Sequence, residues 1–121
     1  MDIEDLHRKF QRELNAGTVS LVLLALLARA GEPQYGYQIA KQLEAVGGAT
    51  GVFKPGTLYP VLRNLAAAGL LESEVEPSVA GPPRRYYRIT AYGRVVLADW
   101  RGAWRSTREL VETVLTEAGP A

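Results

Sequence analysis

The sequence predicts a mainly α-helical protein with one small β-hairpin. Three observations favour this class. Apolar residues recur at helical spacing in several segments, the pattern changes to a strict alternation after Gly69, and the last quarter of the chain returns to helical spacing. With 121 residues, the chain has the length of one domain with a modest core. We therefore expect several helices, a hairpin and a final helix in one folding unit.

Two helices are predicted before the first strong break. Residues 2–15 form an amphipathic pattern, with apolar side chains at Ile3, Leu6, Phe10 and Leu14. We expect Gly17 to end this helix and Thr18 to cap the next one, residues 19–30, which is apolar nearly all round and so belongs in the core. The apolar run is too short to cross a bilayer, which takes about 20 residues, and no secretory cleavage site follows it. These features indicate a cytoplasmic protein that does not bind a membrane.

The middle of the chain predicts two more helices. Residues 35–46 form one of them, which a glycine pair stops, and a short strand is possible at residues 52–53. The next helix begins near Thr57, which we expect to be its N-cap, because Pro60 lacks an N–H and is harmless only in a first turn. Gly69 is the signal for its C-terminal end. The side of this helix that faces the core carries Leu58, Val61, Leu62 and Leu65.

The outer face of this helix is unusual, because a solvent face normally carries Glu and Lys. Here the small residues Gly56, Pro60 and Ala67 have hydroxyl, guanidinium and amide side chains beside them. These polar neighbours are Thr57, Tyr59, Arg63 and Asn64. Such a lean face allows close approach, and the major groove of DNA admits an α-helix. Arg63 can bind guanine O6 and N7 in a bidentate way, worth roughly 1–3 kcal/mol of discrimination. Lys54, just before the helix, can meet a phosphate together with the free backbone N–H groups.

Two strands and a long helix complete the predicted fold. Residues 71–76 and 85–90 alternate in polarity around a turn-rich loop, which predicts a hairpin. Thr90 is the expected cap of a helix from residue 91 to about 117, roughly 39 Å long at about 1.5 Å per residue. This rod is longer than so small a domain needs, and one globule does not easily cover its apolar stripe, which marks an interface. The stripe contains Val96, Leu97, Trp100, Ala103, Trp104, Leu110, Val111, Val114 and Leu115.

The composition argues against an enzyme. The chain has no cysteine and one histidine, His7, which excludes disulfides and thiolate catalysis and makes a His-based metal site a poor expectation. No phosphate-binding glycine loop or nucleophile motif appears, so we expect neither a cofactor nor a metal. The net charge of +1 names no partner, but its distribution is uneven: arginines gather near residues 84–88, while acidic residues crowd the first helix.

Helix–turn–helix followed by a hairpin is the winged helix-turn-helix arrangement, a DNA-binding format. The runs GTLYPVLRNLAAAGLL and RRYYRIT-AYG, with YGYQI upstream, resemble the PadR family of bacterial transcriptional regulators over nearly the whole chain. The resemblance implies a homodimer that binds palindromic double-stranded operators, acts mostly as a repressor and in some members releases DNA on binding a small aromatic or cationic compound. It also implies three parts: an N-terminal helix (1–16), a winged-helix domain (17–90) and a C-terminal dimerisation helix (91–121).

The same resemblance assigns Thr57, Tyr59 and Arg63 to the DNA groove, Tyr37 to a phosphate, and Arg84 with Arg85 to the basic end of the wing. Each assignment has a plainer alternative. The two tyrosines can be packing residues, and Arg63 can be a solvated helix residue. The wing arginines can pair with the glutamates across the hairpin instead: Glu72, Glu74 and Glu76. The sequence alone leaves these alternatives open.

Trp100 and Trp104 lie one helical turn apart on the last helix. They can pack in a dimer core, or they can stack on a flat effector, as the resemblance implies. No carboxylate stands beside them in the sequence in a way that suits a cation, whereas a row of arginines (Arg101, Arg105 and Arg108) follows a neighbouring face and suits an anionic effector. A winged helix used as a protein-interaction module without DNA is the alternative function, favoured by the near-neutral charge and the wing glutamates.

Overall fold

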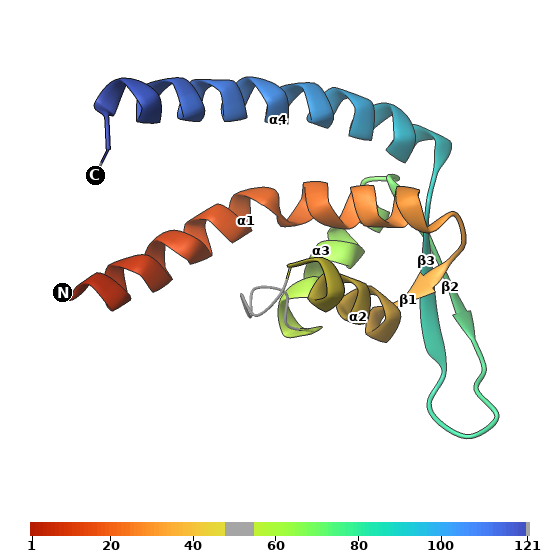
Figure 1. The fold of residues 1–121 in the computed structure, drawn as a ribbon. Helices are drawn as coiled ribbons and strands as arrows, with labels where there is room; N and C mark the ends of the chain where they lie inside the picture. The colour runs from red at the N-terminus through yellow and green to blue at the C-terminus, as the bar shows by residue number, and fades with distance from the viewer. Residues whose placement is uncertain (48–54, 121) are drawn as a thin grey trace.

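The computed structural model describes residues 1–47 and 55–120, which form four long or medium helices and a small sheet (Figure 1). The elements in chain order are α1 (Ile3–Ala30), β1 (Gln34–Tyr35), α2 (Gly36–Gly47), α3 (Pro55–Ala67), β2 (Leu71–Glu76), β3 (Arg84–Ile89) and α4 (Ala91–Ala118). The strands are antiparallel in the order β1-β3-β2. The mainly helical class with a hairpin is confirmed, and β1 adds a third strand that was not predicted. The expected strand at residues 52–53 lies outside the described residues.

One continuous helix, α1, replaces the two helices expected before residue 31. The prediction that Gly17 ends a helix is wrong, because a glycine inside a helix costs only about 1 kcal/mol and the apolar face of the first half continues into the second. Thr18 is not an N-cap. Its Oγ1 donates to the carbonyl of Leu14 at 3.0 Å within the helix. The predicted boundary between residues 16 and 17 therefore falls inside one rod.

The length and composition of α1 also suffice for a membrane span, but its position explains the apolar character differently. Its second half lies under α4 and over α2 and α3 (Figure 1). The residues of α1 that are buried there are Val19, Leu23, Leu24, Leu26 and Leu27. They pack with Ile39 and Leu43 of α2 and with the inner leucines of α3 into one core. This is the pattern of a core helix in a globular domain.

The turn into α2 is held by glutamine side chains. Gln38 Oε1 accepts from the backbone N–H of Tyr35 at 3.0 Å, the bond that the third helical residue makes in a capping box. Gln34 is buried, and its Oε1 accepts from Gln42 Nε2 at 2.6 Å. These bonds satisfy polar groups at the point where the short strand β1 becomes a helix.

Helix α3 begins two residues earlier than expected. Pro55 is its first residue, a position for which proline is pre-organised, so Thr57 lies in the first turn and is not the N-cap. The predicted inner face is confirmed for Leu58, Leu62 and Leu65, all buried. Gly69 ends the helix at φ +82°. Its N–H donates to the carbonyl of Ala66 at 3.0 Å, and the next N–H donates to the carbonyl of Leu65 at 3.0 Å, a Schellman motif.

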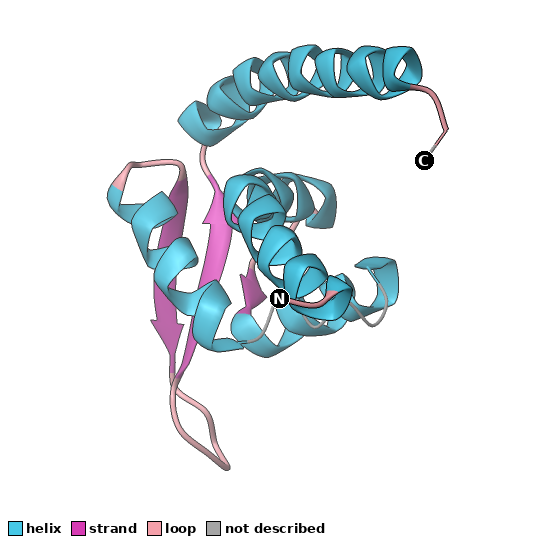
Figure 2. Cartoon of the chain, turned by 90° about the vertical axis from the view of Figure 1, so that its left-hand side faces the viewer, coloured by secondary structure: helices cyan, strands magenta, loops and turns pink. Residues whose placement is uncertain are grey.

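The loop between β2 and β3 lies at one end of the sheet, and the start of α4 lies at the other. The loop between β2 and β3 projects beyond the helices (Figure 2), which is the shape expected of a wing. At the other end, Thr90 caps α4 as predicted, since its Oγ1 accepts from the Gly93 N–H at 2.9 Å. Helix α4 then runs back along α1 in the opposite direction (Figure 1).

Candidate functional site

The outer face of α3 is open. Gly56, Thr57, Pro60, Arg63 and Ala67 are all exposed, while the leucines on the other side hold the helix against α1 and α2. The only large side chain at the centre of this face is that of Arg63, so a partner surface can come close to the helix backbone and still meet a guanidinium. Such a surface suits the major groove of DNA, which is wide enough for one helix. Lys54 lies outside the described residues.

Tyr59 lies at the edge of this face and is partly packed, with 41% of it exposed. Its ring rests on Gly36, the first residue of α2. A Cβ at that position would overlap the ring and would lie 2.9 Å from the hydroxyl oxygen. The packing alternative for Tyr59 is therefore supported in part, because its ring rests on Gly36 while the residue stays partly exposed. Its place in a DNA groove stays a prediction. Gly36 is the residue that permits this contact, and sequence reasoning did not single it out.

Tyr37 belongs to a group of aromatic and cationic side chains at the point where β1 passes into α2. It is 60% exposed, its ring stacks on Tyr35 with centroids 6.4 Å apart, and Lys41 Nζ lies 5.5 Å from its ring centroid. Tyr35 also meets Tyr86 edge-on at 5.4 Å. Tyr37 is thus not a core residue. Its exposed ring carries a hydroxyl and has an ammonium group 5.5 Å from its centroid, two groups that can both contact a phosphate.

The two wing arginines project from opposite faces of the sheet, because neighbouring residues of a strand alternate. Arg85 shares its face with the buried Tyr87, on the side that packs on the helices, and its Nη1 donates to Ser73 Oγ at 3.0 Å. Arg84 points the other way, and its guanidinium carbon lies 4.6 Å from the ring centroid of Tyr35. Both residues are exposed. Arg85 is therefore the wing arginine on the side of α3.

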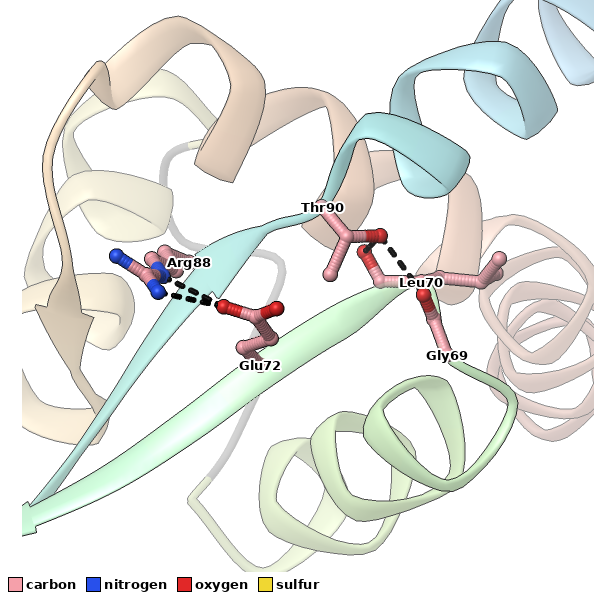
Figure 3. Close-up of polar contacts among 5 residues, drawn as sticks. All are labelled: Gly69, Leu70, Glu72, Arg88 and Thr90. Atoms are coloured by element: carbon pink, nitrogen blue, oxygen red, sulfur yellow. Dashed lines mark hydrogen bonds and ion pairs between the residues drawn. The ribbon is translucent and has the colours of Figure 1, made fainter.

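The ion pairs of the hairpin differ from the expected alternative. Across residues 55–120, the cross-strand ion pair is between Arg88 and Glu72, with Arg88 Nη2 at 2.6 Å from Glu72 Oε2 (Figure 3). Arg84 lies opposite Glu76 in the register, yet its guanidinium rests on the aromatic ring. Glu74 and Glu76 remain exposed on the wing. Arg88, rather than the two predicted arginines, neutralises a wing glutamate.

A cavity of about 450 Å³ lies between α1 and α4 beside both tryptophans. Its walls include Trp100, Trp104, Glu13, Leu14 and Gly17. Glu13 was missed as a site residue, and it is the acidic residue in this lining. The signal was hidden because Gly17 was expected to end the helix, whereas the continuous α1 carries Glu13 alongside α4.

The remaining apolar stripes of α1 and α4 are uncovered. On the first half of α1 the exposed apolar side chains are Ile3, Leu6, Phe10 and Leu14, and on the second half of α4 they are Leu110, Val111, Val114 and Leu115. Soluble monomers rarely leave so much contiguous apolar surface in water. Within the described chain nothing covers these two stripes.

Comparison with known proteins identifies the family. Residues 23–99 match the Transcriptional regulator PadR-like family. The chain is 38% identical over 109 residues to the transcriptional regulator Rv3488 of Mycobacterium tuberculosis, covering 89% of each protein.

Solved structures agree with this match. A PadR family transcriptional regulator from Eggerthella lenta superposes with a TM-score of 0.80 at 34% identity, covering 93% of this chain and 94% of that one. A PadR-like transcriptional regulator from Bacillus cereus does so with a TM-score of 0.69 at 26% identity, over 85% and 96%. The chain therefore belongs to the PadR-like family, whose members are transcriptional regulators and not enzymes.

Proposed function

We propose that this chain is a cytoplasmic, homodimeric repressor that binds a palindromic DNA operator. The observation that carries the proposal is the exposed outer face of α3, where small residues surround Arg63. In the proposed complex this face lies in the major groove, with Thr57 and Tyr59 at its edges. Tyr37 and Lys54 meet phosphates beside it, and Arg84 and Arg85 meet the backbone from the wing.

The uncovered stripes of α1 and α4 support the proposed dimer. A second copy supplies matching apolar surfaces, since a two-fold interface brings the same patch of both subunits together. Two recognition helices related by a two-fold axis read two inverted half-sites, so the operator is expected to be a palindrome.

Fluorescence anisotropy with the DNA upstream of the chain's own gene tests the proposal. The wild-type protein should bind, and its affinity should fall steeply as salt rises. Arg85→Ala should weaken binding to all sequences alike and make the salt slope shallower by about 1, the effect of one lost phosphate contact. Arg63→Ala should instead relax base preference, costing about 1–3 kcal/mol on the preferred site.

Arg12→Ala serves as the matched control. Arg12 is exposed on the first half of α1, and that half of the helix lies far from the β2–β3 loop in Figure 1. This variant should leave both affinity and salt slope unchanged. A wild-type affinity for DNA that does not change with salt concentration, or no DNA binding at low salt, would contradict the proposal. In that case the exposed Glu74 and Glu76 of the wing favour the alternative of a protein-interaction module.

We further propose that a small aromatic effector enters the cavity between α1 and α4 and releases the operator. Trp100 and Trp104 offer flat surfaces for stacking, and Glu13 makes an aromatic cation a better occupant than an anion, since cations are attracted both to carboxylates and to indole faces. The cavity volume of about 450 Å³ falls in the range of small-molecule sites, roughly 300–1,000 Å³.

Tryptophan fluorescence checks this expectation with a matched pair of probes: a planar aromatic ammonium compound and a planar aromatic carboxylate of similar size. The cation should quench the fluorescence more strongly, and Glu13→Gln should reduce its affinity about tenfold or more, the effect of losing one charge-assisted contact of roughly 1.5–3 kcal/mol. Glu4→Gln, a change at a residue that does not line the cavity, is the control. Equal binding of both probes, or tighter binding of the anion, would show that Glu13 does not select the effector.

A further inference from the structure

Strand β3 ends at Ile89 and α4 begins at Ala91, so Thr90 is the whole connection between β3 and α4. The same residue is hydrogen-bonded to the turn that ends α3, the proposed recognition helix. Its Oγ1 donates to the carbonyl of Gly69 at 2.7 Å and lies 3.2 Å from the carbonyl oxygen of Leu70 (Figure 3). The same hydroxyl accepts from the Gly93 N–H. One side chain therefore caps α4 and holds the turn that ends α3.

Backbone contacts tighten the same junction. The N–H of Thr90 donates to the carbonyl of Leu70 at 3.1 Å. Gly93, in the first turn of α4, lies so close to Leu70 that a Cβ there would overlap the Leu70 carbonyl oxygen and would lie 2.8 Å from Ile89 Cγ1. The first turn of α4 and the turn after α3 therefore pack backbone against backbone.

The length of α4 turns this junction into a lever. Its 28 residues make a rod of about 42 Å, so a rotation of only about 10° at Thr90 moves the far end by roughly 7 Å. Because one of the two uncovered stripes of the proposed dimer lies on the far half of α4, a change in the angle at the junction changes how far apart the two α3 helices stand. Half-sites on DNA are about 34–36 Å apart per helical turn, so an error of several ångströms in that separation matters.

We propose that Thr90 is a positioning residue that sets the separation of the two recognition helices through its hydrogen bond to Gly69. This inference rests on the proposed function, because it requires the dimer and its two-site operator. Thr90 itself touches neither DNA nor effector. It acts through the C-terminal turn of α3, and its effect is on geometry rather than on the contacts that α3 makes within one half-site.

Thr90→Asp separates the two roles of the hydroxyl. Aspartate is an effective N-cap and should keep the bond from the Gly93 N–H, but a carboxylate cannot donate to the Gly69 carbonyl. Thr90→Ser keeps both bonds and is the matched control. Thr90→Val, which has the same shape and neither bond, is the second variant if the aspartate variant does not fold. Thermal unfolding at equal protein concentration shows which variants are folded.

The separation itself can be measured without DNA. The chain has no cysteine, so Ala67→Cys places one spin label on the exposed end of each α3. Double electron–electron resonance on the free dimer then reports the distance between the two labels. The parent protein and Thr90→Ser should give one narrow distribution, whereas Thr90→Asp should shift it or at least double its width.

Binding to a series of palindromes that differ only in half-site spacing gives the second measurement, made on unlabelled protein. Thr90→Asp should lose at least tenfold in affinity at the best spacing and bind the other spacings almost equally well. Its affinity for a single half-site should stay within twofold of the parent. Equal losses on one and two half-sites, or an unchanged distance distribution, would overturn the inference and leave Thr90 an ordinary cap. A parent protein that is dimeric but binds no DNA would contradict the proposed function instead, while the distance measurement still decides the role of Thr90.

Discussion

Replacing Val111 and Leu115 together by Asp should convert the proposed dimer into a monomer. Both side chains lie on the exposed apolar stripe of α4, and two unpaired carboxylates in each half of an apolar interface have no partner to offset their desolvation. Affinity for a palindrome should fall at least about hundredfold, because linked binding of two half-sites raises affinity by roughly 10²–10⁴. Sedimentation velocity and anisotropy measure the two effects on the same samples.

Arg105→Asp with Thr116→Asp is the matched control. These positions are exposed on the same helix but lie on the side away from the apolar stripe by helical spacing, so the dimer and its operator binding should persist. Binding of the stripe variant to a single half-site should remain close to that of the wild type, since α3 is unchanged. A dimer that survives the stripe variant would show that subunits meet through another surface.

Gly93→Ala should lower the free energy of unfolding by about 1–3 kcal/mol, the usual cost of forcing an extra carbon into a packed region. The added Cβ meets the backbone carbonyl of Leu70 and the side chain of Ile89, and a backbone group in a hairpin cannot turn aside as a flexible side chain can. The melting temperature should fall by about 4 °C for each kcal/mol. Denaturant titrations must use equal protein concentrations, because dimerisation stabilises the folded state by mass action.

Gly102→Ala on the same helix is the control with the opposite sign. A Cβ there meets nothing within 4 Å, so the change should stabilise the protein by up to about 1 kcal/mol, the difference in helix propensity between the two residues. If both alanine variants stabilised the protein, the close approach of α4 to the turn after α3 would be wrong.

Much of the fold was available from the sequence because its signals are local. Gly69 and Thr90 fixed the ends of α3 and the start of α4, since a left-handed glycine and a capping hydroxyl act within a few residues. No local sequence signal predicts that α1 is one continuous helix. A glycine inside a helix costs little, and the packing of α4 along α1, which decides the matter, is a long-range contact. Strand β1 was not predicted because its two residues are too few to show an alternation of apolar and polar side chains.

The candidate site shows the same division. The inner and outer faces of α3 followed from helical spacing alone. The opposite directions of Arg84 and Arg85 also follow from the alternation of a strand, although grouping them as one basic end concealed this. The contact of Tyr59 with Gly36 and the place of Glu13 beside the tryptophans join separate elements, so no local pattern contains them. A site formed where two helices meet could be described only from the structure.

The single rod of α1 links folding to assembly. Its second half forms the centre of the core, and its first half displays apolar side chains that the proposed partner subunit covers. In the proposed dimer, contacts with the other subunit would limit the unwinding of α1 from its amino end before it reaches the buried residue Val19. If the proposed dimer forms, a low protein concentration would favour single chains, whose exposed first half of α1 would open and be cleaved more readily than in the dimer.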